Sequence, residues 1–187
     1  MIAALPRRSA AVRVVALGTL VVGLEWSRAI VGQQPGLTLA ALLIGGAALI
    51  ATAFPFSGER LGLGTSKLGL RLLGGIALGA VLLLPAAVRP NAVPLIPAGL
   101  AAAAVVVSIG EELAFRGVLY AALEDIGGAP LAIVGSTLLW TLAHVLSHPP
   151  AFLGAVAAAG LLLALWRWAC KDLVGPIVGH VIADLAL

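Results

Sequence analysis

The stretch LIPAGLAAAAVVVSIGEELAFRGVLYAA, residues 95–122, decides the fold class of this chain. Its apolar run is longer than the roughly 20 residues that a helix needs to cross a bilayer. The run nevertheless contains Glu111, Glu112 and Arg116. An ionisable side chain in hydrocarbon is unfavourable unless it is paired or faces a polar cavity. The stretch therefore predicts a membrane-spanning helix that carries a polar site.

The composition extends this prediction to the whole chain. Of 187 residues, 61% are hydrophobic and 10% are charged, and the mean hydropathy is +1.15. A soluble domain is nearer to a quarter charged, so this composition does not fit one. We predict an all-α fold, a polytopic transmembrane helix bundle of about seven spans separated by short polar or Pro- and Gly-containing gaps. The spans are residues 10–31, 37–56, 67–88, 95–122, 129–147, 151–168 and 173–187.

The basic residues predict the orientation of the bundle. Of 11 lysines and arginines, only Arg28 and Arg89 are assigned to the side opposite to the N-terminus. The positive-inside rule then places the N-terminus in the cytoplasm and, with seven spans, the C-terminus outside. The first span lacks a signal-peptide cleavage site, so we expect a retained helix. The basic residues form no cluster, which argues against nucleic-acid binding, and the single cysteine, Cys170, cannot form an internal disulfide.

Charged residues inside the spans indicate where the function lies. Glu112 and Arg116 are four residues apart with the acid first, which favours an ion pair on one helical face. Glu111 is turned by about 100° from its neighbour, so we expect it to lack this partner and to stay available. His180 and Asp184 share a face of the last span in the same way, as do Trp140 and His144 of the fifth.

These polar groups lie at similar depths. The helix rise of about 1.5 Å per residue, counted from the cytoplasmic gaps, brings Glu111, His144 and His180 to comparable levels. We therefore expect one polar centre built by three helices. The alternative is a set of separately satisfied polar residues that hold helices together.

The three motifs resemble those of a known family. Residues 111–116 match EExxxR, residues 140–144 resemble FxxxH with Trp140 in place of Phe, and residues 180–184 match HxxxN/D with Asp184 in place of the commoner Asn. In this order they resemble the CPBP (ABI) family of intramembrane CAAX-processing and bacteriocin-processing proteases. The resemblance covers roughly residues 95–187. It implies a catalytic core of four spans there, preceded by three N-terminal spans in residues 1–94.

The resemblance implies hydrolysis of a peptide bond in a membrane-associated or lipidated substrate. As our hypothesis, Glu111 is the general base, His144 orients the water, and His180, with Asp184 behind it, stabilises the oxyanion or positions the water. Glu112 and Arg116 hold the helix geometry, and Trp140 packs beside the first histidine.

The cofactor stays open at this point, either none or zinc. The metal version would bind zinc through three ligands from the set Glu111, His144, His180 and Asp184, with a water in the open position. We favour direct water activation, because a metal-bound Glu111 would leave no evident base.

Two other functions remain open. A non-catalytic membrane binding or bacteriocin-immunity protein could keep the polar centre for recognition, and a small transporter would also use intramembrane acids and histidines. No inverted repeat supports transport. The expected partners are membrane lipids and a peptide or lipidated protein, and the expected location is a bacterial plasma membrane.

Two further groups of polar residues lie outside this constellation. His148 precedes two prolines and is expected to be solvated at a helix end, while Glu25 and Arg28 are interpreted as a local ion pair.

Overall fold

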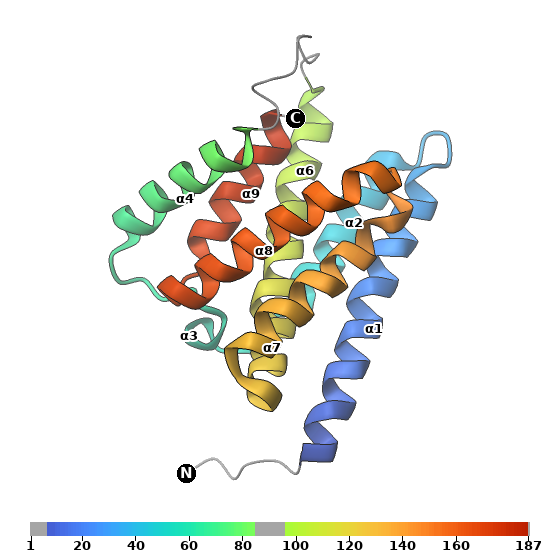
Figure 1. Cartoon of the computed structure of the whole chain (residues 1–187). Helices are drawn as coiled ribbons and strands as arrows, with labels where there is room; N and C mark the ends of the chain where they lie inside the picture. Colours follow the sequence, from blue (N-terminus) through green and yellow to red (C-terminus); the bar gives the residue numbers. More distant parts are fainter. Residues whose placement is uncertain (1–6, 85–95, 187) are drawn as a thin grey trace.

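The computed structural model describes residues 7–84 and 96–186, and all regular structure in these two ranges is helical. The predicted all-α class is therefore confirmed (Figure 1). The elements are α1 (Arg7–Gly32), α2 (Thr38–Ala51), α3 (Gly58–Leu61), α4 (Leu68–Leu82), α6 (Ala98–Glu111), η1 (Glu112–Leu119), α7 (Tyr120–Ala143), η2 (His144–Leu146), η3 (Pro150–Phe152), α8 (Leu153–Cys170) and α9 (Val174–Ala186).

Three helical stretches among the described residues are long and apolar enough to cross a membrane: Ala10–Gly32, Ala98–Leu146 and Pro150–Cys170. The apolar helices α2, α4 and α9 have 14, 15 and 13 residues. At about 1.5 Å per residue each covers only about 20 Å, less than the ~30 Å hydrocarbon core. The predicted runs were longer because they counted flanking apolar residues that form turns, such as residues 52–56. An integral membrane protein is indicated, whereas seven full spans are not shown.

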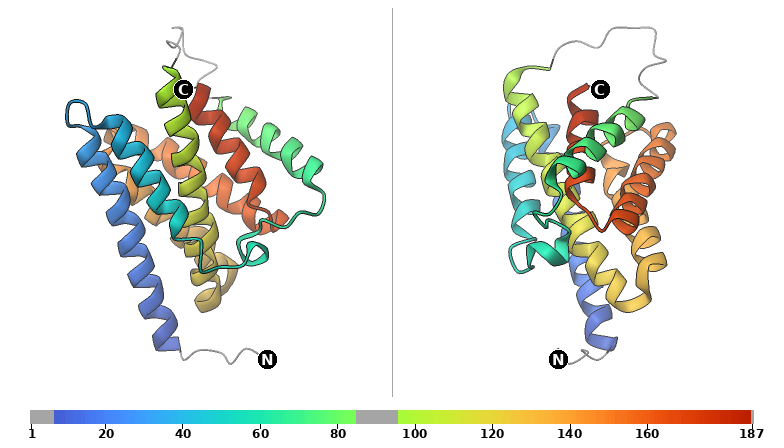
Figure 2. Two further views of the ribbon diagram at one scale, coloured as in Figure 1. Left: turned by 180° about the vertical axis from the view of Figure 1, so that it is seen from behind. Right: turned by 90° about the vertical axis from the view of Figure 1, so that its left-hand side faces the viewer.

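The stretch Ala98–Leu146 bends back on itself. Gly128 has a φ of +68°, in the region that favours glycine, and Gly127 is also non-helical. Pro130 follows, where its fixed φ suits the first turn of a new helical run. The chain therefore descends to this bend and returns beside itself (Figure 2). The predicted break between the spans 95–122 and 129–147 is confirmed, but its non-helical part is limited to Gly127 and Gly128.

The motif at residues 111–116 lies across a change of helix type. Glu111 ends α6, and the eight residues from Glu112 to Leu119 form a π-helix, all of them buried. The sequence predicted a continuous α-helix, because apolar patterning does not distinguish the two. π-Helical turns are rare and frequently occur at functional sites.

Small residues let the helices approach closely. A Cβ on Gly75 of α4 would lie 2.6 Å from Val178 of α9, and one on Gly79 would lie 2.9 Å from Ile182. The pair α2 and α6 is packed in the same manner, since a Cβ on Gly110 would lie 2.6 Å from a backbone oxygen of α2. Such close contacts are typical of helix pairs in membranes, so Gly75, Gly79 and Gly110 serve helix packing.

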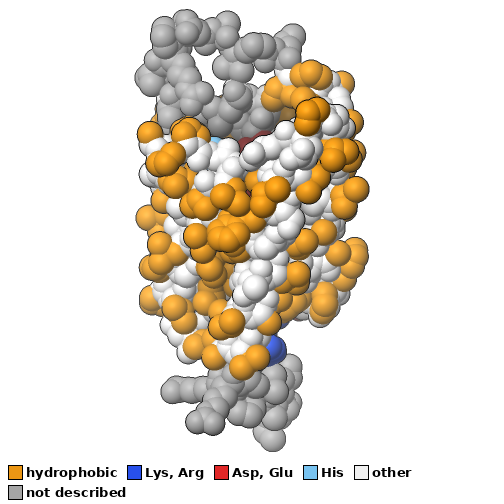
Figure 3. Space-filling model, turned by 90° about the vertical axis from the view of Figure 1, so that its right-hand side faces the viewer, with side chains coloured by type: hydrophobic (Ala, Val, Ile, Leu, Met, Phe, Trp, Pro, Cys, Tyr) orange, Lys and Arg blue, Asp and Glu red, His pale blue; other side chains and the backbone are white. Residues whose placement is uncertain are grey.

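The outer surface fits a lipid environment. Large hydrophobic side chains are exposed on several helices, among them Val15 of α1, Ile44 of α2 and Leu138 of α7. One face of the molecule is covered by such side chains, with almost no charge (Figure 3). In water a patch of this size would mark a binding site or an aggregation liability.

The bundle has two distinct ends. The start of α1, the short helix α3 and the Gly127–Gly128 bend lie at one end, whereas the α1–α2 turn and the end of α9 lie at the other (Figures 1 and 2). The first of these is the end that the basic residues assign to the cytoplasm.

We predict that Cys170 is labelled only from the cytoplasmic side. This residue, the only cysteine in the sequence, is exposed at the end of α8 and precedes Lys171. A membrane-impermeant maleimide should therefore label it in inverted vesicles and not in intact cells.

A matched control is Cys170→Ser combined with Gln34→Cys in the α1–α2 turn, which should show the reverse pattern. Labelling of Cys170 in intact cells would contradict the orientation.

Candidate active site

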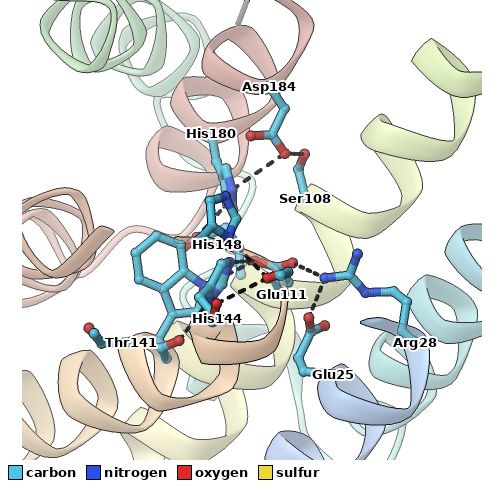
Figure 4. Close-up of polar contacts among 12 residues, drawn as sticks. Glu25, Arg28, Ser108, Glu111, Thr141, His144, His148, His180 and Asp184 are labelled. Carbon is cyan, nitrogen blue, oxygen red and sulfur yellow. Dashed lines mark hydrogen bonds and ion pairs between the residues drawn. The ribbon is translucent and has the colours of Figure 1, made fainter. Parts of the chain in front are cut away.

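Polar side chains from four parts of the chain meet at one cavity of about 530 Å³. They come from α1, from the α6–η1 junction, from the end of α7 with η2, and from α9 (Figure 4). All four residues predicted as catalytic line this cavity, together with groups that were not predicted to do so. The polar lining residues are Arg28, Glu111, Trp140, His144, Ser147, His148, His180 and Asp184.

Glu111 is held from two sides. Its Oε2 accepts a hydrogen bond of 2.9 Å from the indole N–H of Trp140, and its Oε1 accepts one of 3.0 Å from Arg28. The side chain is only 4% exposed. The expectation that this carboxylate would stay available, without a neutralising partner, was therefore wrong. As expected, Arg116 does not pair with Glu111. The cation that does is Arg28 of α1, and residue spacing within one helix could not predict a contact with another helix.

Glu112 forms the predicted ion pair with Arg116 at 3.0 Å, and both side chains are fully buried. The same carboxylate oxygen lies 2.9 Å from Nδ1 of His180 on α9. The Arg116 guanidinium also lies over the ring of Trp140, 4.1 Å from its centroid. This pair therefore ties α9 and α7 to the π-helix.

His144 has a ring orientation fixed by its neighbours. Its Nδ1 lies 2.8 Å from the backbone oxygen of Trp140, and its Nε2 lies 3.5 Å from Oε2 of Glu111. Because a carbonyl oxygen only accepts, Nδ1 carries the proton. The two rings are in edge contact with centroids 4.6 Å apart. Trp140 thus packs beside His144 as predicted, and its N–H supplies a hydrogen bond that a phenylalanine could not.

His180 and Asp184 form a second pair, with Nε2 and Oδ2 separated by 3.5 Å. Oδ2 of Asp184 also accepts a hydrogen bond of 2.7 Å from Ser108 of α6. About a third of the Asp184 side chain is exposed. Ser108 was missed by the sequence reasoning, although it lies one turn before Glu111 and so on the same side of α6.

The family comparison agrees with this geometry. Residues 93–186, about half of the chain, match the Rce1-like type II CAAX prenyl endopeptidase family. The chain belongs to this family. No curated protein and no protein of known structure matches it. The resemblance drawn from the three motifs is thus confirmed, and membership in a peptidase family suggests a protease.

His148 belongs to the cavity of this Rce1-like chain, contrary to the prediction of a solvated helix end. The side chain of His148 is half-buried. Its ring centroid lies 5.2 Å from that of His144 and 5.3 Å from that of Phe152, on which the His148 ring stacks. Burial lowers the pKa of His148 below the usual value for histidine, and the neighbouring His144 lowers it further. The following prolines suggested a rim position, but η3 turns the chain back over the cavity.

The arrangement does not fit a metal ion. In the described ranges, no three His, Cys, Asp or Glu side chains converge as ligands. The four residues of the metal hypothesis instead divide into two contacting pairs, Glu111 with His144 and Asp184 with His180. Neither pair alone supplies the three protein ligands that a catalytic zinc site uses.

We predict that Arg116→Met strongly destabilises the protein. Removing one partner of a buried ion pair leaves an uncompensated charge, which typically costs about 3–5 kcal/mol. Unfolding in detergent should show this loss, and adding Glu112→Gln should recover part of it.

The matched control is Arg60→Met. Arg60 pairs with Asp125, and both side chains are more than 40% exposed. Such surface pairs contribute about 1 kcal/mol or less. Equal losses for the two arginine variants would contradict the structural role of the buried pair.

Proposed function

We propose that this chain is an intramembrane endopeptidase of the CAAX prenyl protease (CPBP) type that hydrolyses its substrate with water activated by Glu111 and His144. The observation that carries the proposal is the pair of acceptor atoms at the cavity, Oε2 of Glu111 and Nε2 of His144, which lie 3.5 Å apart.

Two acceptors at this separation call for a donor between them. With its proton on Nδ1, neutral His144 presents only a lone pair at Nε2, and an ionised carboxylate also only accepts. A water molecule that donates one hydrogen to each would satisfy both groups. Its oxygen lone pairs would then point away from both, toward a peptide in the cavity.

The reaction follows from this arrangement. The water oxygen bonds to the scissile carbonyl carbon while Glu111 takes one of its protons, which gives a tetrahedral intermediate. Glu111 then returns the proton to the amide nitrogen, and the carbon–nitrogen bond breaks. The products are a carboxylic acid and an amine. His144 orients the water through Nε2.

His180 is the proposed oxyanion donor. The carboxylate of Glu112 fixes its Nδ1, so that Nε2 lies toward the cavity and Asp184. Because Nδ1–H donates to Glu112, a proton on Nε2 makes the ring an imidazolium, a charge that the neighbouring carboxylates of Glu112 and Asp184 stabilise. The Nε2–H of this imidazolium can be donated to the oxygen that becomes negative in the intermediate. In this proposal Asp184 orients the ring and is itself held by Ser108. Glu112 and Arg116 support this geometry without touching the substrate.

The proposed substrate is a membrane-associated or lipidated peptide. One wall of the cavity is the apolar face of α8, with Ala155, Ala158, Ala159 and Leu162. Such a wall suits aliphatic side chains or a lipid chain beside the scissile bond. Both a leader peptide and a prenylated C-terminus offer such apolar groups.

The proposed setting is a bacterial plasma membrane with the N-terminus in the cytoplasm. Residues 95–187 would form the catalytic core of four spans and residues 1–94 the three preceding spans, with membrane lipids as partners. The exposed apolar side chains and the two ends of the bundle support this setting.

The central test is cleavage of defined peptides by the purified protein in detergent. The panel contains a farnesylated peptide whose last four residues are cysteine, two aliphatic residues and a variable C-terminal residue with a free carboxylate. It also contains the unlipidated counterpart of this peptide and a membrane-anchored leader peptide. We expect cleavage of at least one of them and a loss of about 100- to 10,000-fold in kcat for Glu111→Gln. His144→Ala should also lose activity, measured by mass spectrometry of the products.

The control variant is Asp125→Asn, which removes an exposed acid far from the cavity and should keep wild-type activity. Cleavage that survives Glu111→Gln would overturn the mechanism. Binding of a peptide without cleavage would favour the alternative of a membrane binding or bacteriocin-immunity protein.

A second prediction concerns metal removal. Because the candidate ligands form two separate pairs, dialysis against a strong chelator should leave the cleavage rate unchanged. Loss of activity that zinc restores would show that the side chains rearrange around a metal and would refute direct water activation.

A further inference from the structure

Arg28 lies outside the segment that defines the family and yet reaches the candidate base. It is on α1, whereas the family match covers residues 93–186. Its guanidinium donates to Oε1 of Glu111 at 3.0 Å and also pairs with Glu25, one turn earlier on α1. Figure 4 shows the arginine between the two carboxylates. A local ion pair accounts for the contact between Glu25 and Arg28, but it does not account for the contact between Arg28 and Glu111.

The cluster formed by Glu25, Arg28 and Glu111 is buried, and its two carboxylates share one guanidinium. The side chains of Arg28 and Glu25 are 11% and 2% exposed. Oε1 of Glu25 and Nε of Arg28 have no hydrogen-bond partner among residues 7–84 and 96–186. Helix packing alone would be served as well by apolar residues of similar size, since burying charges incurs a desolvation penalty. The presence of this cluster despite the desolvation penalty indicates a functional role at the cavity, which Arg28 lines.

A second helix is shaped around the arginine. A Cβ added to Gly45 of α2 would lie 2.9 Å from Cδ of Arg28 and 3.1 Å from its Cβ and Cγ. The absence of a side chain at Gly45 therefore lets the Arg28 stem pass between α1 and α2 toward Glu111. This steric fit is a separate observation from the ion pairs, because it does not depend on the charge of Arg28.

The two contacts of Glu111 divide its oxygens. Trp140 and His144 lie at Oε2, on the side proposed to hold the water, while Arg28 holds Oε1. A carboxylate fixed at Oε1 cannot rotate Oε2 away from His144.

We propose that Arg28 is a positioning residue for Glu111, held in place by Glu25 and by the space at Gly45. The inference rests on the proposed role of Glu111 as general base. It follows that the family segment alone does not complete the site and that α1 contributes to catalysis.

The test compares Arg28→Met, Arg28→Lys, Glu25→Gln and the double variant Glu25→Gln/Arg28→Met. The probe is whichever peptide of the panel the wild type cleaves. We expect Arg28→Met to lower kcat by about 100-fold, the scale of a misplaced catalytic group, with little change in KM. Arg28→Lys should lose less, because lysine keeps the charge but not the guanidinium fork. The double variant should lose no more than Arg28→Met, since Glu25 acts through Arg28.

The control is Arg13→Met, which removes an exposed arginine from the same helix and should leave kcat unchanged. Wild-type kcat in Arg28→Met, with activity lost in Glu111→Gln, would overturn the positioning role and leave the proposed function standing. A further loss in the double variant would show that Glu25 acts independently and would also contradict the proposal.

A readout independent of cleavage is the unfolding temperature in detergent. Arg28→Met leaves two buried carboxylates without their shared cation, so its fall in unfolding temperature should shrink when Glu111→Gln is added. If the wild type cleaves no peptide, the proposed function fails, and this coupling alone decides whether Arg28 holds Glu111. Purely additive effects of the two substitutions would overturn the proposal.

Discussion

Two adjacent carboxylates in the middle of an apolar helix constrain the whole arrangement. Neither can remain in this environment without donors from other parts of the chain. Glu112 contacts His180 of α9, whereas Glu111 contacts Trp140 of α7 and Arg28 of α1. These contacts converge on the α6–η1 junction from three directions. The requirement of the acids for partners therefore determines which helices meet, and the cavity lies at their meeting point.

The same requirement separates the two acids by role. Glu112 is fully buried, and Arg116 and His180 share its Oε1, so its carboxylate serves to fix other groups. Glu111 lines the cavity and has an oxygen beside a histidine acceptor. Glu111 and Glu112 are thus adjacent in sequence but lie in different environments. Such differences in environment give paired carboxylates different roles in hydrolytic sites.

Local patterns predicted much of this structure, and contacts between distant segments were predicted poorly. The helical class follows from hydropathy and the Glu112–Arg116 pair from a spacing of four residues. The presence of Glu111, His144 and His180 at one cavity follows from their similar depth along the helices. The contact between Arg28 and Glu111, which are 83 residues apart, could not be predicted in this way, because Glu25 already offers Arg28 a partner within its own helix. The π-helix was missed since one extra residue in a turn leaves the apolar pattern intact. The cavity position of His148 depends on how η3 folds back, which the two prolines alone do not determine.

The shortness of α4 and α9 has a consequence for the surrounding lipid. These helices lie side by side, and Leu70 and Leu73 of α4 are exposed. A bilayer that must match about 20 Å of hydrophobic length compresses locally, at a modest energetic penalty per ångström. The headgroup layer would dip beside the wall of the cavity that α9 forms. Such a dimple shortens the path by which water, the second reactant of any hydrolysis, arrives from the aqueous phase.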